Sequence, residues 1–414
     1  MNSIGKIEDY SCHGRYNDDG KPTHTSEEQK RVENLVDKLY RKRVELRNKQ
    51  LLNLFRNEHI CYLQDSLFMG LNERMAVLDS SRPWLVYWIA HSLALLGKQK
   101  FLRDNDYKIV DFLKRCRSLD GGYGGGPQQE GHLAATYAAT NALITIGGAI
   151  AYESFDREAI RKFLLSMQQS DGSFTMHASG EVDIRGAYCA LSVAKILNMP
   201  IYSDCSSSSG QQEKGDGLFA KTADWILSCQ TYEGGFGAAP GHEAHGGYTF
   251  CGVATLVFLN QLHRCNIDAL IRWTANKQLQ FEGGFSGRTN KLVDGCYSFW
   301  NGAVIPIIQT WLNKSESKQF HQWLINQEAL QKYILICCQD NRGGLWDKPG
   351  SSRDFYHTCY TLSGLSLAQN SFETNIIVGD ASNSVEPMHP LFNVTLDCLA
   401  EAKEYFLNMD QTKV

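Results

Sequence analysis

The chain has 414 residues, 43% of them hydrophobic, and its 41 Lys and Arg against 45 Asp and Glu give a formal net charge of −4. This balance lacks the basic footprint of nucleic-acid binding, so we expect no nucleic-acid partner. No apolar run reaches the roughly 18–20 residues that span a bilayer, so we expect no membrane span. The 13 scattered cysteines include no C-x-x-C pair, and the N-terminus is polar, which together predict free thiols in the cytoplasm.

The N-terminal part of the chain divides into a polar tail and a charged helix. Residues 1–24 contain Gly and Pro and show little periodicity, which predicts a flexible tail. Residues 25–55 are typical of a long helix, with Ser26 as the candidate N-cap. Because this helix is strongly charged, we expect it to lie on the outside of the body, in solvent or against a partner chain.

The first strongly apolar helix is predicted at residues 81–97, SRPWLVYWIAHSLALLG, with Pro83 in its first turn, where a missing amide is harmless. Four of its ring-bearing side chains recur three to four residues apart and therefore share one face. A stripe of this kind either packs in the core or lines an apolar cavity. It consists of Trp84, Tyr87, Trp88 and His91.

A glycine turn that ends in an aromatic or leucine residue recurs along the rest of the chain. The five turns begin at Asp120, Ser170, Glu233, Glu282 and Arg342. Shortly after each turn a tyrosine opens an apolar stretch, and these tyrosines are Tyr137, Tyr188, Tyr248, Tyr297 and Tyr360. A period of roughly fifty to sixty residues is typical of a repeat architecture in which each unit is one supersecondary element.

Within each unit the apolar residues recur at helical spacing, so we predict an all-α fold with two helices per unit. The clearest helical stretches are residues 134–146, 187–197, 251–262 and 297–312. The Ser- and Gly-rich residues 202–217 lie between units and predict a surface loop. We expect a closing helix from His389 and a polar tail at residues 408–414.

The residues three positions before the five tyrosines predict a common site. They are Ala134, Arg185, His245, Asp294 and His357, so four of the five are ionisable. When repeats close into a ring, equivalent positions come to one central opening. We therefore expect these side chains to gather there.

Three side chains from this register predict a metal site. Asp294 and Cys296 lie two residues apart, and His357 is the equivalent of Asp294 in the next unit. Sulfur, oxygen and nitrogen ligands together favour zinc, and three protein ligands leave the fourth position open, as catalytic zinc requires. The alternative interpretation is that Cys296 is a buried free thiol.

Cations and aromatic rings surround these residues in the sequence. The cations are Arg185, His245, Arg288, Lys291 and Lys348. They predict a phosphate or diphosphate ligand, because Arg and Lys form charge-assisted bonds with its oxygens, although unrelated surface salt bridges would give the same composition. The rings are Trp84, Trp88, Tyr137, Tyr188, Tyr248, Phe250, Tyr297, Trp300 and Tyr360. An apolar ligand that carries a diphosphate fits both sets.

From about Ser81 to Asn393 the chain resembles the β subunits of protein farnesyltransferases, within the protein prenyltransferase β family. The motifs that carry the resemblance are SRPWLVYW, GGYGGGP, HLAATYAA, DGSFTMH, GEVDIRGAYCA, EGGFG, HGGYTFCG, FEGGF, GRTNKLVDGCYSFW, LWDKPG and SRDFYHTCY. The resemblance implies a single-domain α/α barrel, a toroid of helical hairpin repeats. It also implies a heterodimer with an α subunit, which contributes a Lys to the site, and transfer of farnesyl from farnesyl diphosphate to the Cys of C-terminal Cys-a-a-X motifs, as in Ras-like GTPases.

The resemblance also implies a role for each matched residue. One Zn²⁺ would be held by Asp294, Cys296 and His357, take the substrate thiol as its fourth ligand and lower the pKa of that thiol. The diphosphate cradle and catalytic group would be His245, Arg288, Lys291 and Tyr297. The isoprenoid would contact Arg185, Tyr188, Gly247, Tyr248, Cys251 and Trp300. Peptide binding and lipid length would depend on Trp84, Trp88, His132, Ala134, Tyr137, Tyr356 and Tyr360. Asp347 matches a carboxylate associated with Mg²⁺ at the leaving diphosphate.

The division of the chain follows from the same comparison. We predict an N-terminal tail at residues 1–24, a barrel at residues 25–407 with the insert at 202–217, and a tail at residues 408–414. Ala135 stands where the family commonly has Pro, which leaves the preferred last residue of the peptide open.

Three other functions compete with this one. A type I geranylgeranyltransferase β subunit would share the fold and the chemistry, but bulky Trp84 and Tyr360 and the carboxylate of Asp347 favour the farnesyl enzyme. A terpene cyclase would need a DxDD or DDxxD cluster, and the sequence has neither. A non-catalytic repeat scaffold would leave Asp294, Cys296 and His357 without a role.

Overall fold

The computed structural model describes residues 14–45, 52–69, 73–200, 219, 221–315, 323–370 and 375–411. Within these residues the regular structure is helical, apart from isolated bridges and one short hairpin. The predicted surface loop at residues 202–217 lies outside them, as do residues 1–13 of the predicted tail. The division into tail, barrel and tail stays a prediction.

The helices form an inner and an outer set. The inner set is α3 (Arg82–Leu95), α6 (Leu133–Ile146), α9 (Ile184–Ile196), α11 (Gly246–Phe258), α13 (Tyr297–Trp300), α14 (Val304–Ser315) and α16 (Phe355–Gln369). The outer set is α2 (Arg56–Phe68), α4 (Gln99–Asp104), α5 (Asp106–Arg115), α7 (Ala149–Glu153), α8 (Arg157–Met167), α10 (Thr222–Ser228), α12 (Ile267–Ala275) and α15 (Gln327–Cys337). Short 3₁₀ helices are η3 (Glu73–Ser81), η4 (Leu262–Arg264) and η5 (Ala381–Asn383).

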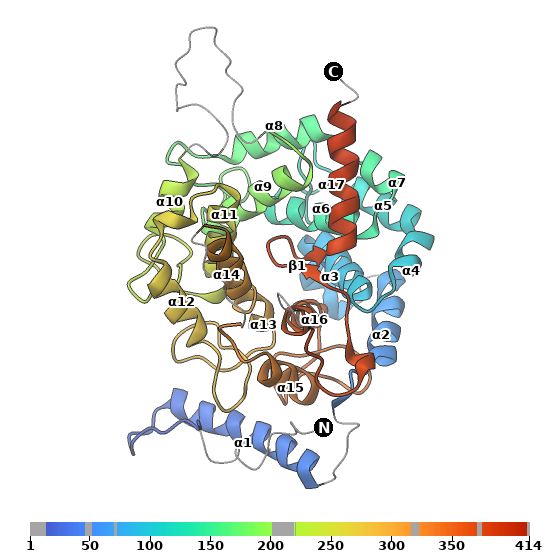
Figure 1. The fold of residues 1–414 in the computed structure, drawn as a ribbon. Helices are drawn as coiled ribbons and strands as arrows, with labels where there is room; N and C mark the ends of the chain where they lie inside the picture. Colours follow the sequence, from blue (N-terminus) through green and yellow to red (C-terminus); the bar gives the residue numbers. More distant parts are fainter. Residues whose placement is uncertain are drawn as a thin grey trace.

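Contacts between the inner helices run once round a ring and return to the start. α3 packs against α6, α6 against α9, α9 against α11, and α11 against both α13 and α14. α13 then packs against α16, and α16 packs against α3. Figure 1 shows these helices around a common centre, with the outer helices around them. The prediction of an α/α barrel built from helical hairpins is confirmed.

The first glycine of each repeated turn allows close packing between units. All five have a positive φ, which glycine adopts without steric cost, and they are Gly121, Gly172, Gly234, Gly283 and Gly343. A Cβ on Gly121 would lie 2.2 Å from the Ala159 carbonyl oxygen in α8, and one on Gly343 would lie 2.1 Å from the Glu58 carbonyl oxygen in α2. Because the last turn packs on α2, the first outer helix, the series of units closes on itself.

Threonine hydroxyls fix the offset between a turn and the inner helix that follows it. The backbone N–H of Tyr123 donates to Thr136 Oγ1 at 2.9 Å, thirteen residues further along the chain. The same bond, with the same spacing and length, joins Phe236 to Thr249 and Leu345 to Thr358. Each bond satisfies a buried amide. The regular spacing seen in the sequence therefore has a structural cause.

Helix α1 (His24–Glu45) begins one residue before the predicted start, and its cap differs from the prediction. The backbone N–H of Ser26 donates to Thr23 Oγ1 at 3.1 Å, and the N–H of Thr23 donates to Ser26 Oγ at 2.8 Å. Such a reciprocal pair is a capping box with Thr23 as the N-cap, so the prediction of Ser26 was wrong. The helix packs against α15, and the Tyr40 hydroxyl donates to the Glu282 carbonyl at 2.6 Å.

Two predicted helices are interrupted. Residues 297–312 form α13 and α14, because the Gly302 N–H bonds five residues back to the Tyr297 carbonyl at 3.2 Å and widens the turn. The closing helix does not begin at His389: β1 (Met388–His389) pairs antiparallel with β2 (Val394–Thr395), and α17 (Leu396–Gln411) follows. Its last turn includes residues 408–411, which we had expected in the tail.

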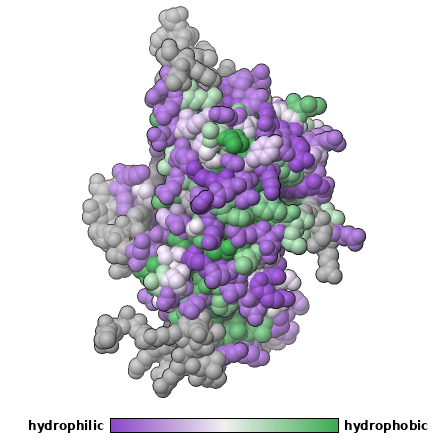
Figure 2. Space-filling model, turned by 90° about the vertical axis from the view of Figure 1, so that its right-hand side faces the viewer, coloured by the Kyte–Doolittle hydropathy of each residue, from purple (hydrophilic) through white to green (hydrophobic). Residues whose placement is uncertain are grey.

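One face of the molecule shows how hydrophilic and apolar side chains are distributed on the surface. On the face shown in Figure 2, hydrophilic side chains predominate, and apolar side chains gather near its middle. In the described residues, every helix is too short or too polar to cross a bilayer.

Candidate active site

The predicted metal ligands come together at the start of two neighbouring inner helices. Asp294 and Cys296 lie in the loop that leads into α13, and His357 lies in the first turn of α16. One ligand atom from each residue can be chosen so that all three lie within 4.8 Å of one another. The Cys296 N–H donates to the Asp294 carboxylate at 2.8 Å, so the loop itself holds the first two ligands in place.

Asp354 orients the imidazole of this cluster. It is the N-cap of α16: its Oδ1 accepts the His357 N–H at 2.6 Å, and its Oδ2 lies 2.6 Å from His357 Nδ1. The other ring nitrogen, Nε2, lies 3.4 Å from Asp294 Oδ1. Burial lowers the pKa of His357, but the bonds to Asp294 and Asp354 outweigh it and raise that pKa to about 10. When one imidazole nitrogen of a histidine binds a metal, the other nitrogen commonly donates a hydrogen bond to a carboxylate, which fixes the orientation of the ring.

The donor set fits a zinc ion. The Cys296 thiol is buried, and burial together with the neighbouring Asp294 raises its pKa well above the usual value. A cation that takes the place of the protons on the buried thiol and on the imidazole is stabilised by the half-buried Asp294 carboxylate beside them. Sulfur, oxygen and nitrogen are also the ligand atoms that zinc accepts, and a three-residue set leaves one position for a substrate.

A histidine aims a tyrosine hydroxyl near the cluster. His245 is the N-cap of α11, and its Nδ1 accepts the Gly247 N–H at 3.1 Å. Nδ1 therefore carries no proton, so Nε2–H donates to the Tyr297 hydroxyl oxygen at 2.9 Å. The hydroxyl hydrogen of Tyr297 is then left to donate to a ligand. Burial, reinforced by Arg288, lowers the pKa of His245, which keeps this neutral form.

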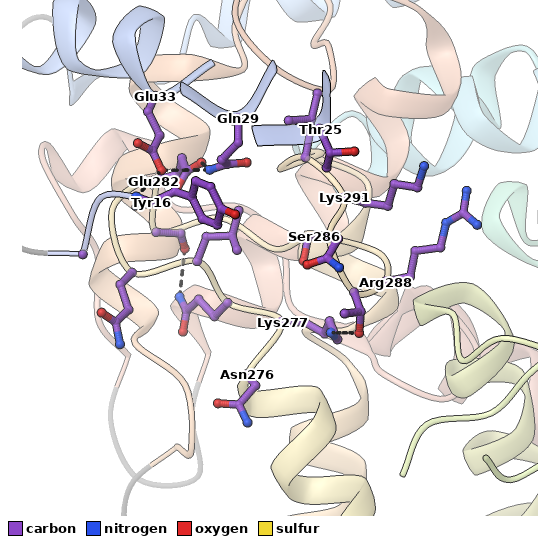
Figure 3. A pocket seen from close by; sticks show the side chains of 18 of the residues that line it. Tyr16, Thr25, Gln29, Glu33, Asn276, Lys277, Glu282, Ser286, Arg288 and Lys291 are labelled. Atoms are coloured by element: carbon purple, nitrogen blue, oxygen red, sulfur yellow. Dashed lines mark hydrogen bonds between the residues drawn. The ribbon is translucent and has the colours of Figure 1, made fainter. Parts of the chain in front are cut away.

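Two of the five predicted cations line one cavity. Arg288 and Lys291 lie in the loop before Asp294, and both border a cavity of about 940 Å³ between this loop and α1. Figure 3 shows their charged ends extending toward the same side, away from Tyr16 and Gln29. Arg288 forms an ion pair with Glu243 at 2.8 Å. The cavity borders neither the metal cluster nor the aromatic wall described below, so it marks only the cationic edge of the site.

Aromatic rings form a closed circuit of contacts inside the ring of helices. Neighbouring ring centroids lie 4.4–5.7 Å apart along the order Trp88, Trp84, Tyr137, Tyr188, Phe250, Trp300, Tyr360, Tyr356 and back to Trp88. The rings come from α3, α6, α9, α11, α13 and α16. Trp300 Nε1 donates to the Tyr356 hydroxyl at 3.0 Å, and Tyr356 precedes His357, so the wall reaches the metal cluster.

Comparison with known proteins identifies the family. The chain matches the prenyltransferase alpha-alpha toroid domain over residues 54–394. It is 42% identical over 390 residues to the protein farnesyltransferase subunit beta of Pisum sativum, a match that covers 78% of this chain and 89% of the relative. The chain belongs to the family of protein farnesyltransferase β subunits.

One further relative agrees with this assignment, and one solved structure agrees with the fold. Identity to the protein farnesyltransferase subunit beta of Arabidopsis thaliana is 39% over 420 residues, covering 86% of this chain and 84% of the relative. The solved structure of Candida albicans protein geranylgeranyltransferase-I complexed with GGPP superposes with a TM-score of 0.69 and covers 86% of this chain and 99% of that one. At 21% identity, this second match shows the shared fold.

Three further predicted contact residues of this farnesyltransferase β subunit lie in, or directly before, the neighbouring inner helices α6, α9 and α11. Arg185 forms an ion pair with Asp183 at 2.6 Å, and its guanidinium lies 6.0 Å from the Tyr248 ring centroid. Cys251 is buried in α11. His132 caps α6 by accepting the Ala134 N–H at 3.1 Å. The individual roles of these residues stay predictions.

Asp347 lies beside the cluster through its backbone. Its carbonyl accepts the Gly295 N–H at 2.7 Å and the Tyr333 hydroxyl at 2.8 Å, while its carboxylate pairs with Lys348. The predicted magnesium role of the carboxylate stays a prediction.

Sequence reasoning missed Asp354 and Asp183, although both carry a signal. Each is an Asp directly before an apolar helix, and such a residue is a strong N-cap candidate. Asp354 stands three residues before His357, the spacing that lets a cap also reach that side chain. Reading the two helix starts for caps would have found both.

Proposed function

We propose that this chain is the catalytic β subunit of a protein farnesyltransferase, which moves a farnesyl group from farnesyl diphosphate to the Cys of a C-terminal Cys-a-a-X motif. One observation carries the proposal: the Asp294, Cys296 and His357 cluster adjoins a closed aromatic wall. An apolar chain along the wall would bring its reacting carbon to a thiol at the cluster. In the reaction the bond from C1 to the diphosphate oxygen breaks, a sulfur–carbon bond forms, and the thiol proton leaves.

Three side chains would hold zinc, and a fourth would position one of them. Asp294, Cys296 and His357 supply the ligand atoms, and Asp354 fixes the orientation of the imidazole. When bound, zinc supplies a Lewis acid that lowers the pKa of a thiol ligand, so that thiolate is available near neutral pH.

The diphosphate cradle, which consists of His245, Arg288, Lys291 and Tyr297, would stabilise the negative charge that builds on the leaving diphosphate. Arg288 and Lys291 are long cations on one loop, suited to charge-assisted bonds with its oxygens. Tyr297 donates its hydroxyl hydrogen, which His245 leaves free by donating to the hydroxyl oxygen. Donors fixed in advance where charge develops contribute most to such a step, and the loss of one typically costs about 2.7–4 kcal/mol.

The partners and other contacts follow from family membership. We propose an α subunit as the second chain of a heterodimer, a cytoplasmic location, and Mg²⁺ near Asp347 to assist the leaving diphosphate. The peptide end would lie near Trp84, His132 and Ala134. Ala135 is buried in the first turn of α6, and unlike Pro it does not fix the backbone φ angle at this position.

A donor comparison tests the proposal. The chain is co-expressed with its cognate α subunit, and transfer from farnesyl and geranylgeranyl diphosphate to peptides ending in Met, Ser or Leu is measured alongside zinc content. We expect one zinc per β chain and preferred use of the farnesyl donor. A preference for the geranylgeranyl donor would assign the type I geranylgeranyltransferase instead, and bound lipid without transfer would favour a non-catalytic scaffold.

A further inference from the structure

A backbone hydrogen bond recurs between neighbouring units of the ring. At or just before the start of four inner helices, an N–H donates to a carbonyl in the next glycine turn over 2.7–2.9 Å. The accepting residue always stands two positions after the aromatic or leucine residue of that turn. The pairs, donor first, are Leu133 and Met176, Ile184 and Ala238, Gly246 and Gly287, and Gly295 and Asp347. These bonds join each unit to the next one.

The fourth of these bonds holds the metal loop. Gly295 is buried and stands between the predicted ligands Asp294 and Cys296. Its N–H donates to the Asp347 carbonyl at 2.7 Å, while the Cys296 N–H donates to the Asp294 carboxylate at 2.8 Å. The third ligand, His357, lies on a different element, α16. A shift of the Asp347 carbonyl would therefore move the first two ligands relative to the imidazole.

A tyrosine hydroxyl from the outer set of helices holds the accepting carbonyl in place. Tyr333 lies in α15 and is buried, and its hydroxyl donates to the Asp347 carbonyl oxygen at 2.8 Å. A carbonyl oxygen has two lone pairs, so it can accept from Tyr333 and from Gly295 at once. Because the hydroxyl is buried, neither it nor the carbonyl would readily find water as a replacement partner. The tyrosine thus fixes the position of the carbonyl on which the metal loop depends.

The equivalent ring in two other units makes no such bond. Tyr333 packs against Gly284, the second glycine of the preceding turn, so closely that a Cβ there would collide with the ring. The rings in the same place in other units are Phe163 in α8 and Trp273 in α12. Phenylalanine has no donor, and Trp273 Nε1 has no hydrogen-bond partner among the described residues. Packing of the repeat therefore requires a ring but no hydroxyl, and Tyr333 supplies its hydroxyl beside the metal loop.

We propose that Tyr333 is a positioning residue of the metal site: through the Asp347 carbonyl, its hydroxyl fixes Gly295 and with it the two ligands that flank this glycine. The inference rests on the proposed function, in which these ligands hold zinc. Helix α15 also packs against α16, which carries His357, so one outer helix supports all three ligands (Figure 1). Without the hydroxyl the loop has more freedom, and zinc affinity falls because binding must then order the ligands.

The test uses the purified heterodimer and Tyr333→Phe, which keeps the ring. Zinc affinity is measured by competition with a chelator, and the thiolate-to-metal absorption band is recorded after replacement of zinc by cobalt. We expect zinc affinity to fall about tenfold, as is usual when a residue that supports a metal ligand is lost, and the cobalt band to change.

Tyr87→Phe is the matched control. Tyr87 is also buried, and its hydroxyl donates to the Asn393 backbone carbonyl at 2.6 Å, a bond that involves neither the metal loop nor α15. This variant loses a bond of the same kind, so its stability should fall in the same way. Its zinc affinity and its cobalt band should stay at the wild-type values. An equal loss of zinc affinity in this control would overturn the inference, because any lost buried bond would then have the same effect.

Hydrogen exchange at the Gly295 amide tests the same idea even if Tyr333→Phe does not fold. In the wild-type heterodimer the bond to Asp347 should protect this amide, and a folded Tyr333→Phe variant should exchange it about fivefold faster, as the loss of one hydrogen bond allows. An unprotected amide in the wild type, or a zinc affinity in Tyr333→Phe that matches the wild-type value, would overturn the inference while the proposed function stood. A wild-type heterodimer that holds no zinc would overturn the proposed function itself.

Discussion

Replacing Asp354 by Asn tests how the cluster is built. The carboxylate makes two separate bonds of 2.6 Å: Oδ1 caps α16 through the His357 N–H, and Oδ2 accepts from His357 Nδ1. Asn is as good an N-cap as Asp, so the helix start is kept. The charged acceptor on the imidazole is lost. Loss of such a support typically lowers metal affinity by about 10–100-fold, equivalent to about 1.4–2.8 kcal/mol.

The assay is competition for zinc against a chelator of known affinity, with the purified heterodimer at fixed pH. Asp354→Ala should lose the cap as well, which lowers the free energy of unfolding by a further 1 kcal/mol or so, about the usual value of a cap. Asp156→Asn is the matched control: Asp156 caps the outer helix α8 through the Ala159 N–H at 3.0 Å, so zinc affinity should not change. Zinc affinity of Asp354→Asn within about twofold of wild type would refute the idea that this carboxylate supports a metal ligand.

Four further predictions concern the cradle, the wall and the N-terminal helix. Gly287→Ala places a Cβ 2.0 Å from Tyr297 Cζ, so the displaced hydroxyl should lower the single-turnover rate by about 10²–10³-fold, as Tyr297→Phe also should. Arg288→Ala should slow the same step by a similar factor, with zinc retained. Trp84→Thr should shift donor preference toward the twenty-carbon diphosphate. Burial raises the pKa of the Glu282 carboxyl to about 7. Between pH 4.5 and 7 this carboxyl is therefore ionised in the unfolded chain but protonated in the folded chain, so the free energy of unfolding falls as the pH rises. Glu282→Gln should remove that fall, which is on the order of 3 kcal/mol, when stability is measured by denaturant titration across this pH range.

Each of these predictions has an outcome that contradicts it. A Gly287→Ala enzyme that still loses activity on adding Tyr297→Phe would show that the two changes act independently. An unchanged single-turnover rate would remove Arg288 from the cradle, and an unchanged donor ratio would place the length limit away from Trp84. Equal slopes of stability with pH in wild type and Glu282→Gln would mean that this carboxyl is ionised in the folded chain.

The repeat was visible in the sequence because it depends on side chains at fixed spacing. Glycines at positive φ and threonines that bond the turn leave a regular pattern, and Gly343 and Thr358 follow it as Gly121 and Thr136 do. The same register predicts that Asp294 and His357 lie together, and they do. Ligand chemistry and repeat position were sufficient to predict that Asp294, Cys296 and His357 lie together, since both are properties of residue type and order.

One part that was missed depends on the backbone. The hairpin at residues 388–395 is held by hydrogen bonds to backbone carbonyls, which every residue has, so its residue types do not distinguish it from the start of the predicted closing helix. The break between α13 and α14 lies at Gly302, where one bond spans five residues, and Pro306 follows in the first turn of α14. Glycine and proline inside a helical pattern both indicate an interruption, so this break could have been predicted from the sequence. Asp354 was also predictable, because its position before α16 was a readable cap signal.

X-ray absorption at the zinc edge of the purified heterodimer tests the central claim most directly. The account predicts one zinc per β chain with a single sulfur ligand from the protein at about 2.3 Å and nitrogen and oxygen ligands at about 2.0–2.2 Å. Addition of a Cys-containing peptide should raise the sulfur count by one, and Cys296→Ala should abolish zinc retention while lipid diphosphate still binds. A site with four sulfurs, or equal zinc content in Cys296→Ala and wild type, would contradict it.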